Sequence, residues 1–189
     1  YRFFKTILTP IFKWWYHPKI IGQELIPKKG PIIIACNHIH LFDQCLAIIS
    51  TKRIIRYMAK KEYFDGKMAW FFHSVGCIPV NRQIHDKQAV NQALKVLNEG
   101  GALGIFPEGT RNKTDAFLLP FKFGAVSMAQ KTKATIVPMG LTGDYKFRSK
   151  NLTARFGQPF KVENMTLEEA NAHLYAEIKS LMKQNLTDD

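Results

Sequence analysis

The sequence lacks the features that mark secreted, membrane-spanning and repetitive proteins. It has only three cysteines in 189 residues, and an odd number without paired spacing argues against a disulfide framework and for a reducing compartment. No run of about 18 uncharged apolar residues occurs, so we expect no membrane-spanning helix. Arg2, Lys5 and Lys13 interrupt the first apolar stretch, which therefore makes a poor signal peptide. Without a fixed-period repeat or a Ser/Gly-rich linker, the chain is predicted to form one compact domain.

Acidic residues are also few, and their distribution is uneven. The chain has 27 Lys and Arg against 15 Asp and Glu, a formal net charge of +12. Residues 151–189 carry a net charge of −2, which leaves +14 on residues 1–150. A positive field of this size attracts nucleic acid, an anionic membrane, or phosphorylated and carrier-bound substrates. A solubilising surface is the alternative, so charge alone does not choose a partner.

The first sixteen residues predict an amphipathic helix. Apolar side chains recur at three- and four-residue spacing, with Arg2, Lys5, Thr6, Thr9 and Lys13 between them. Pro10 either kinks this helix or begins a second one. Aromatic rings beside cationic side chains are typical of interfacial helices, and packing on the protein's own core is the alternative. We predict that residues 1–18 dock on the cytoplasmic face of the cell membrane and that residues 19–189 form the catalytic domain.

Strand and helix patterns alternate along the rest of the chain. Short apolar runs predict strands at 32–36, 53–59, 77–80, 102–106 and 135–141, and Pro138 within the last run indicates an edge strand or a bulge. Helical periodicity appears at 68–75, 86–99, 120–131 and 167–184. This alternation predicts an α/β sheet covered on both faces, with the functional site in the loops that leave the strand ends.

The first strand is followed by a histidine and an aspartate five positions apart, His38 and Asp43. On a loop that enters a helix, the carboxylate can accept one imidazole N–H and leave the other ring nitrogen free to take a proton from an alcohol. This is the base-and-orienter half of a hydrolase triad. Alone the motif is short enough to arise by chance.

A second set of polar residues follows the fourth predicted strand, in Phe106-Pro107-Glu108-Gly109-Thr110-Arg111. Proline and glycine make a tight turn that frees backbone N–H groups for a ligand. Arg111 adds a planar fork that matches phosphate oxygens, although a simple Glu108–Arg111 ion pair is the alternative. Arg82 leaves another strand end in Val80-Asn81-Arg82.

The order and spacing of these motifs resemble the glycerolipid acyltransferase family, specifically the 1-acylglycerol-3-phosphate (lysophosphatidic acid) acyltransferases. The resemblance spans about Gly22 to Gly140 and includes Asn37-His38-x4-Asp43, Gly76-Cys77-Ile78-Pro79-Val80-Asn81-Arg82, Phe106 to Arg111, Pro120-Phe121-Lys122 and Val137-Pro138. It implies a mixed, largely buried sheet flanked by helices.

The resemblance also implies roles for individual residues. His38 would be the general base and Asp43 its orienting partner, while the acceptor would be held by Arg82, Glu108, Gly109, Thr110 and Arg111. The donor would be acyl-CoA or acyl-carrier protein, the acceptor lysophosphatidic acid, and no metal or cofactor is expected. The chain departs from the family at His40 and Asn112, where serine is usual.

Other interpretations use the same residues differently. A zinc site would draw on Cys36, His38, His40, Asp43, Cys45, His73 and Cys77. A non-catalytic phospholipid-binding module would use the basic region, and a related enzyme would acylate glycerol-3-phosphate or another lysophospholipid. Nucleic acid is disfavoured because no recognised motif appears. Trp70, Phe71 and Phe72 are predicted to line an acyl tunnel or to pack in the core.

Overall fold

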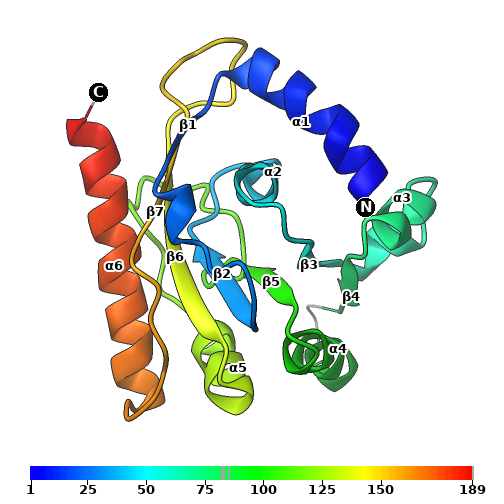
Figure 1. Cartoon of the computed structure of the whole chain (residues 1–189), viewed down its shortest axis with the longest axis vertical. Helices are drawn as coiled ribbons and strands as arrows, with labels where there is room; N and C mark the ends of the chain where they lie inside the picture. The colour runs from blue at the N-terminus through cyan, green and yellow to red at the C-terminus, as the bar shows by residue number, and fades with distance from the viewer. Residues whose placement is uncertain (82–83, 85, 189) are drawn as a thin grey trace.

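The computed structural model describes residues 1–81, 84 and 86–188 of the chain. Within this part, seven strands form one sheet in the order β1-β7-β6-β2-β5-β3-β4, flanked by helices (Figure 1). The strands are β1 (Lys19–Ile21), β2 (Ile32–Cys36), β3 (Ile55–Lys60), β4 (Ile78–Val80), β5 (Ala102–Ile105), β6 (Thr135–Thr142) and β7 (Thr153–Phe156). The α-helices are α1 (Arg2–Tyr16), α2 (Asp43–Ser50), α3 (Ala69–Ser74), α4 (Lys87–Asn98), α5 (Gly124–Thr132) and α6 (Leu167–Thr187).

The sheet is mixed, and its five-stranded majority is parallel. Strands β6, β2, β5, β3 and β4 run in one direction. β7 pairs antiparallel with β6, and β1 pairs parallel with β7, so these two run the opposite way. The predicted α/β class, a mixed and largely buried sheet flanked by helices, is confirmed.

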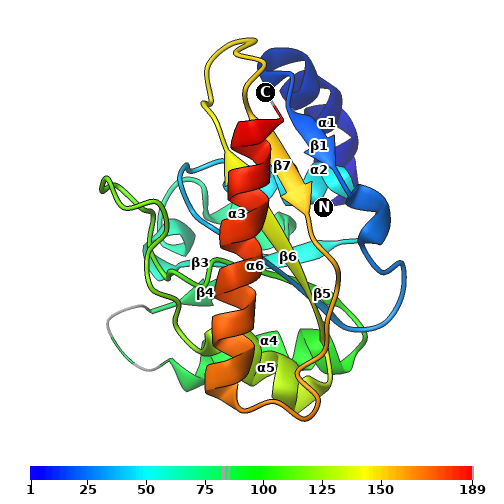
Figure 2. The same ribbon diagram turned by 90° about the vertical axis from the view of Figure 1, so that its left-hand side faces the viewer.

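Helices cover both faces of this sheet. Every residue of β2 is buried, and because side chains alternate along a strand, Ile33 and Ala35 join one core while Ile32 and Ile34 join the other. The first core is shared with α4, α5 and α6; in Figure 2, α6 runs along the front of the sheet, and α4 and α5 lie at the bottom. The second is shared with α2 and with the inward side of α1.

Helix α1 is a single helix that contains Pro10, so the alternative of two helices is wrong. None of its residues is buried. Phe12 and Tyr16 pack against the second core, and Lys5 Nζ reaches inward to donate to the carbonyl oxygen of Arg53 over 3.3 Å. The outward side is apolar and exposed, with Phe3, Ile7, Leu8, Ile11, Trp14 and Trp15. Among the described residues, no helix combines the length and the hydropathy needed to cross a membrane.

Pro138 lies in an internal strand, so the prediction of an edge strand is wrong. Strand β6 pairs with β2 on one side and with β7 on the other. On the β7 side, Ile136 pairs with Phe160 whereas Met139 pairs with Phe156, so the register shifts by one residue across Pro138. A bulge therefore accommodates the missing N–H of proline, as the second alternative required.

Helix α5 begins later than its sequence pattern predicts. The helix expected over residues 120–131 is observed over Gly124–Thr132. Residues 120–123 pack instead against the turn that follows β5, where Lys122 N donates to Pro107 O over 2.9 Å. The difference matters for the site, because this contact fixes the turn that carries Glu108 and Gly109.

Candidate active site

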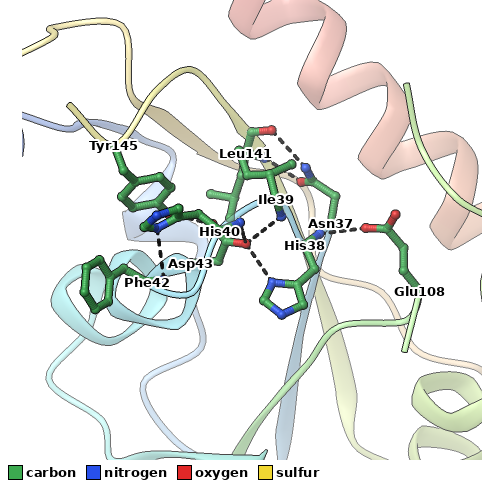
Figure 3. Close-up of polar contacts among 9 residues, drawn as sticks. All are labelled: Asn37, His38, Ile39, His40, Phe42, Asp43, Glu108, Leu141 and Tyr145. Carbon is green, nitrogen blue, oxygen red and sulfur yellow. Dashed lines mark hydrogen bonds and ion pairs between the residues drawn. The ribbon is translucent and has the colours of Figure 1, made fainter. Parts of the chain in front are cut away.

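The predicted site residues gather at the carboxyl edge of the parallel strands. His38 follows β2, Glu108 follows β5, and both are brought together with Asp43, the first residue of α2 (Figure 3). Parallel strands end at a common edge, so residues distant in sequence meet there. Arg82 follows β4 but lies outside the described residues.

A buried carboxylate organises the centre of this site. Asp43 is fully buried, and its Oδ2 lies 2.7 Å from His38 Nδ1. The same oxygen accepts the backbone N–H groups of Ile39 at 2.7 Å and His40 at 2.8 Å (Figure 3). Because the carboxylate accepts, the neutral imidazole carries its proton on Nδ1. Nε2 of His38 is thereby left with a free lone pair that can accept a proton.

The loop that carries His38 is held by the residue before it. Asn37 is buried; its Nδ2 donates to Leu141 O over 3.0 Å, and its Oδ1 accepts from Leu141 N over 2.7 Å. These bonds extend the β2–β6 ladder by a side chain after the chain has left the strand (Figure 3). Buried amides need such partners, so Asn37 fixes where the strand ends and where the imidazole begins.

Glu108 braces the same loop from the β5 side. Its Oε1 accepts from His38 N over 2.6 Å, and its Oε2 accepts from Leu119 N over 3.0 Å. Burial raises the pKa of Glu108, and the two backbone hydrogen bonds oppose this effect. Both oxygens are thus engaged by backbone donors, so the alternative of a simple Glu108–Arg111 ion pair is wrong.

The imidazole of His38 packs against the turn after β5. Its ring stacks on Phe106 with centroids 3.8 Å apart and planes 12° apart. The carbonyl of His38 accepts from Asn112 N over 2.7 Å. Asn112 stands at the position where the family usually has serine. Its side chain bonds within the local turn, where Nδ2 donates to Ala116 O over 2.6 Å. His38 keeps 12% of its side-chain surface exposed, so part of the side chain remains accessible.

The remaining predicted residues lie on the rim of the site. Gly109 has a φ of 72°, a left-handed conformation that favours glycine, and a Cβ there would meet the side chain of Lys122 at 2.9 Å. Thr110 and Arg111 are exposed. Arg111 makes no hydrogen bond or ion pair among the described residues, and the next residue, Asn112, donates its backbone N–H to His38 O, so Arg111 lies close to the His38 loop.

Comparison with known proteins identifies the family. A model of the acyltransferase family matches residues 17–142, which include every predicted site residue. The chain belongs to the acyltransferase family. It is 34% identical over 145 residues to the 1-acyl-sn-glycerol-3-phosphate acyltransferase of Bacillus subtilis, covering 76% of this chain and 71% of that protein. It is 36% identical over 149 residues to the protein of the same name from Borreliella burgdorferi, covering 76% and 59%.

A solved structure supports the fold. The crystal structure of the 1-acyl-sn-glycerophosphate acyltransferase from Thermotoga maritima superposes with a TM-score of 0.82 at 22% sequence identity. The match covers 97% of this chain and 78% of that structure. At this identity the likeness concerns the fold, so the roles of individual side chains rest on their own geometry.

One contact in this acyltransferase was not anticipated from its sequence. The hydroxyl of Tyr145 donates to Asp43 Oδ1 over 2.7 Å, from the segment that follows β6. Burial and the charge of Asp43 raise the pKa of Tyr145, so the phenol stays protonated as a donor. Because 102 residues separate the two side chains, no short-range pattern predicts their contact.

The alternative of a zinc site finds no support in the arrangement. Burial raises the pKa of the Cys45 thiol to about 12 and raises the pKa of Cys36 well above its usual range. Cys36 instead packs within one of the two apolar cores as part of β2. Within the described part of the acyltransferase, no group of three or more His, Cys, Asp or Glu side chains has the geometry of a metal site.

Proposed function

We propose that this acyltransferase moves a fatty acyl group from an acyl thioester to the sn-2 hydroxyl of 1-acyl-sn-glycerol 3-phosphate, giving phosphatidic acid. The donor is acyl-CoA or acyl-carrier protein. The proposal is supported by the names of the two bacterial relatives. The observation that carries it is the 2.7 Å contact between His38 Nδ1 and the buried carboxylate of Asp43, because acyl transfer to an alcohol needs a positioned base.

The reaction follows from the free lone pair on His38 Nε2. This nitrogen takes the proton of the acceptor hydroxyl as its oxygen attacks the thioester carbonyl carbon. The new C–O bond forms and the C–S bond breaks without an acyl-enzyme. The imidazolium, stabilised by Asp43, then returns its proton to the leaving thiolate. The acceptor hydroxyl thus takes the place that a serine holds in a hydrolase triad.

The acceptor phosphate is proposed to bind at the mouth of the site. Arg111 is exposed there, on the turn that Gly109 closes, and Arg82 is proposed as a second cation. Arginine presents a planar fork that matches phosphate oxygens. Glu108, whose oxygens are both bonded to backbone N–H groups, acts here by holding the His38 loop to the acceptor turn.

Replacing Arg111 tests this assignment. We expect Arg111→Ala to raise KM for the lysolipid about 10- to 100-fold, the range that follows from losing a hydrogen bond to a charged group, with a smaller change in kcat. The KM of Arg111→Lys is expected to lie between the values for wild type and Arg111→Ala, because a point charge cannot replace a bidentate fork. Steady-state kinetics over a range of lysolipid concentrations measures both constants.

Lys113→Ala is the matched control, since it removes another exposed cation two residues further along. Its KM is expected to stay within about twofold of wild type, as is usual for an isolated surface charge. Equal changes in the two variants would show that Arg111 contributes only to the general positive field, and would contradict a specific phosphate contact.

The outward side of α1 is proposed to dock on an anionic membrane surface. This side carries six exposed apolar residues, while Lys5 of the same helix is turned inward. Phe147 extends the apolar surface, because its ring lies 5.7 Å from Trp14 and 4.9 Å from Trp15. Aromatic rings at headgroup depth and nearby cations are the means by which interfacial helices bind lipid.

Substitution of two outward residues tests the docking surface. Ile7→Gln combined with Ile11→Gln is expected to lower partitioning to anionic vesicles about 10²- to 10⁴-fold, since burying each such side chain contributes about 1.5–3 kcal/mol. Sedimentation with vesicles that contain phosphatidylglycerol measures the effect. Leu186→Gln, which removes an exposed apolar side chain from α6 on the opposite face of the sheet, is the control. If both variants partitioned to the vesicles as strongly as wild type, α1 would be excluded as the docking surface.

A further inference from the structure

The segment between β6 and β7 contributes a side chain to the active-site carboxylate. Tyr145 lies three residues beyond the part of the chain that matches the family model, and its hydroxyl reaches Asp43 Oδ1 over 2.7 Å (Figure 3). It is the donor to the one carboxylate oxygen that the His38 loop leaves unused, because His38, Ile39 and His40 all bond Oδ2. With Tyr145 in place, both oxygens of Asp43 have donors.

The ring of Tyr145 is held in place from two sides. His40 stacks on it with centroids 4.2 Å apart and planes 18° apart, and Tyr16 of α1 meets it edge-on with centroids 5.6 Å apart. His40 stands at the position where the family usually has serine, so this chain has a ring there that a serine would not supply. Its own backbone N–H also bonds Asp43. The departure from the family pattern and the Tyr145 contact therefore belong to one cluster.

The segment that carries Tyr145 is in turn fastened to α1. Arg148 N donates to Trp15 O over 2.8 Å, and the ring of Phe147 packs against Trp14 and Trp15. These contacts restrict the segment close to the phenol. A side chain that packs against two other rings, in a segment whose backbone is fastened nearby, can hold a partner in one orientation at little further cost in entropy.

We propose that Tyr145 is a positioning residue of the acyltransferase, which fixes the carboxylate of Asp43 so that His38 presents Nε2 to the acceptor hydroxyl. The proposal rests on His38 being the catalytic base. A carboxylate bonded only through Oδ2 can rotate about its Cβ–Cγ bond, and rotation would move the acceptor of the His38 Nδ1–H. A small misplacement of a catalytic group costs rate without weakening substrate binding.

Tyr145→Phe removes the hydroxyl and keeps the ring between His40 and Tyr16. We expect kcat to fall about tenfold with KM for the lysolipid unchanged, because a misplaced base slows the chemical step alone. The low-field proton resonance of His38 Nδ1–H gives a readout that does not depend on activity. Without the phenol, the carboxylate can rotate away from this proton, so the hydrogen bond weakens and the resonance is expected to move to higher field.

Tyr57→Phe is the matched control. Tyr57 is buried in β3, and its hydroxyl has no hydrogen-bond partner within the described part of the chain, so the same atom is removed without breaking a bond. This variant is expected to keep the wild-type kcat, KM and resonance, with thermal stability equal or higher.

The outcomes separate the inference from the proposed function. A wild-type kcat and an unmoved resonance in Tyr145→Phe would overturn the role of Tyr145. So would a fall in kcat with an unmoved resonance, which would reflect a general loss of packing. If His38→Ala retained full activity, the proposed function would fail, whereas a shifted resonance in Tyr145→Phe would still establish the contact with the His38–Asp43 pair.

Discussion

His38→Ala is expected to lower kcat for acyl transfer by about 10² to 10⁴, the usual contribution of a positioned general base. Its KM for the lysolipid is expected to change little, because the phosphate is bound by other residues. The imidazole stacks on Phe106 and bonds Asp43, yet the loop itself is held through backbone atoms of residues 38 to 40. Stopped-time measurement of phosphatidic acid at saturating substrates gives kcat directly.

The control for this variant is a measurement that it folds like the wild type. The circular dichroism spectrum and the thermal midpoint of His38→Ala should stay close to those of wild type, since most of its backbone bonds remain. His40→Ala is the matched substitution, because it removes the neighbouring imidazole while leaving the His38–Asp43 bond intact. A larger loss in His40→Ala than in His38→Ala would transfer the role of base to His40 and contradict our assignment.

Asp43→Asn is expected to lower kcat by about 10³ to 10⁴, as the loss of the orienting charge does in a serine hydrolase triad. The amide oxygen can still accept the three N–H groups that now meet Oδ2, and the amide N–H₂ can donate to the oxygen of Tyr145. The shape of the site therefore survives, whereas the negative charge that stabilises the His38 imidazolium is lost. Single-turnover kinetics with saturating enzyme isolates this effect on the chemical step.

Asp43→Ala separates charge from structure. It is expected to lose at least as much activity as Asp43→Asn and also to lower the free energy of unfolding, because four donors lose their acceptor inside the protein. Each buried group left unsatisfied costs about 1–3 kcal/mol, so a fall in the thermal midpoint of several degrees is expected by calorimetry. Full activity in Asp43→Asn would show that the carboxylate acts only as a scaffold.

Elements with an unbroken apolar run or a regular helical periodicity were predictable from the sequence. The run Ile32–Cys36 is apolar on both sides because β2 is buried between two layers of helices, and its predicted bounds match the strand. Helix α4 was also predictable, since its apolar face repeats every three to four residues and Asp86 caps its first turn by accepting from Ala89 N. In both cases the local pattern and the tertiary environment agree.

Elements that depend on distant pairing were not predictable. Strands β1 and β7 have three and four residues. β1 becomes a strand by pairing with β7, Lys19 with Thr153 and Ile21 with Arg155, and β7 also pairs with β6 on its other side. Such short segments carry too few residues for a periodic signal. The prediction of an edge strand at Pro138 failed for a similar reason, because its place inside the sheet depends on a register shift in a neighbouring segment.

The site was predictable to the extent that its residues are near in sequence. His38 and Asp43 are five residues apart and meet within one loop, so their contact follows from a short motif. Glu108 lies beside the His38 loop, but its partners, the backbone N–H groups of His38 and Leu119, depend on how two strand ends come together. Tyr145 reaches the carboxylate across 102 residues, and only the folded chain shows it.

The most direct test of the central claim is to identify the product formed from an acyl thioester and 1-acyl-sn-glycerol 3-phosphate in mixed vesicles, by mass spectrometry with free thiol measured in parallel. We predict that wild type forms phosphatidic acid acylated at sn-2 and releases one thiol for each molecule formed, while folded His38→Ala forms little of either. Acylation of glycerol-3-phosphate or another lysophospholipid in its place would contradict the assigned acceptor. Folded wild type that acylates none of these acceptors would contradict catalysis and leave phospholipid binding as the function of this site.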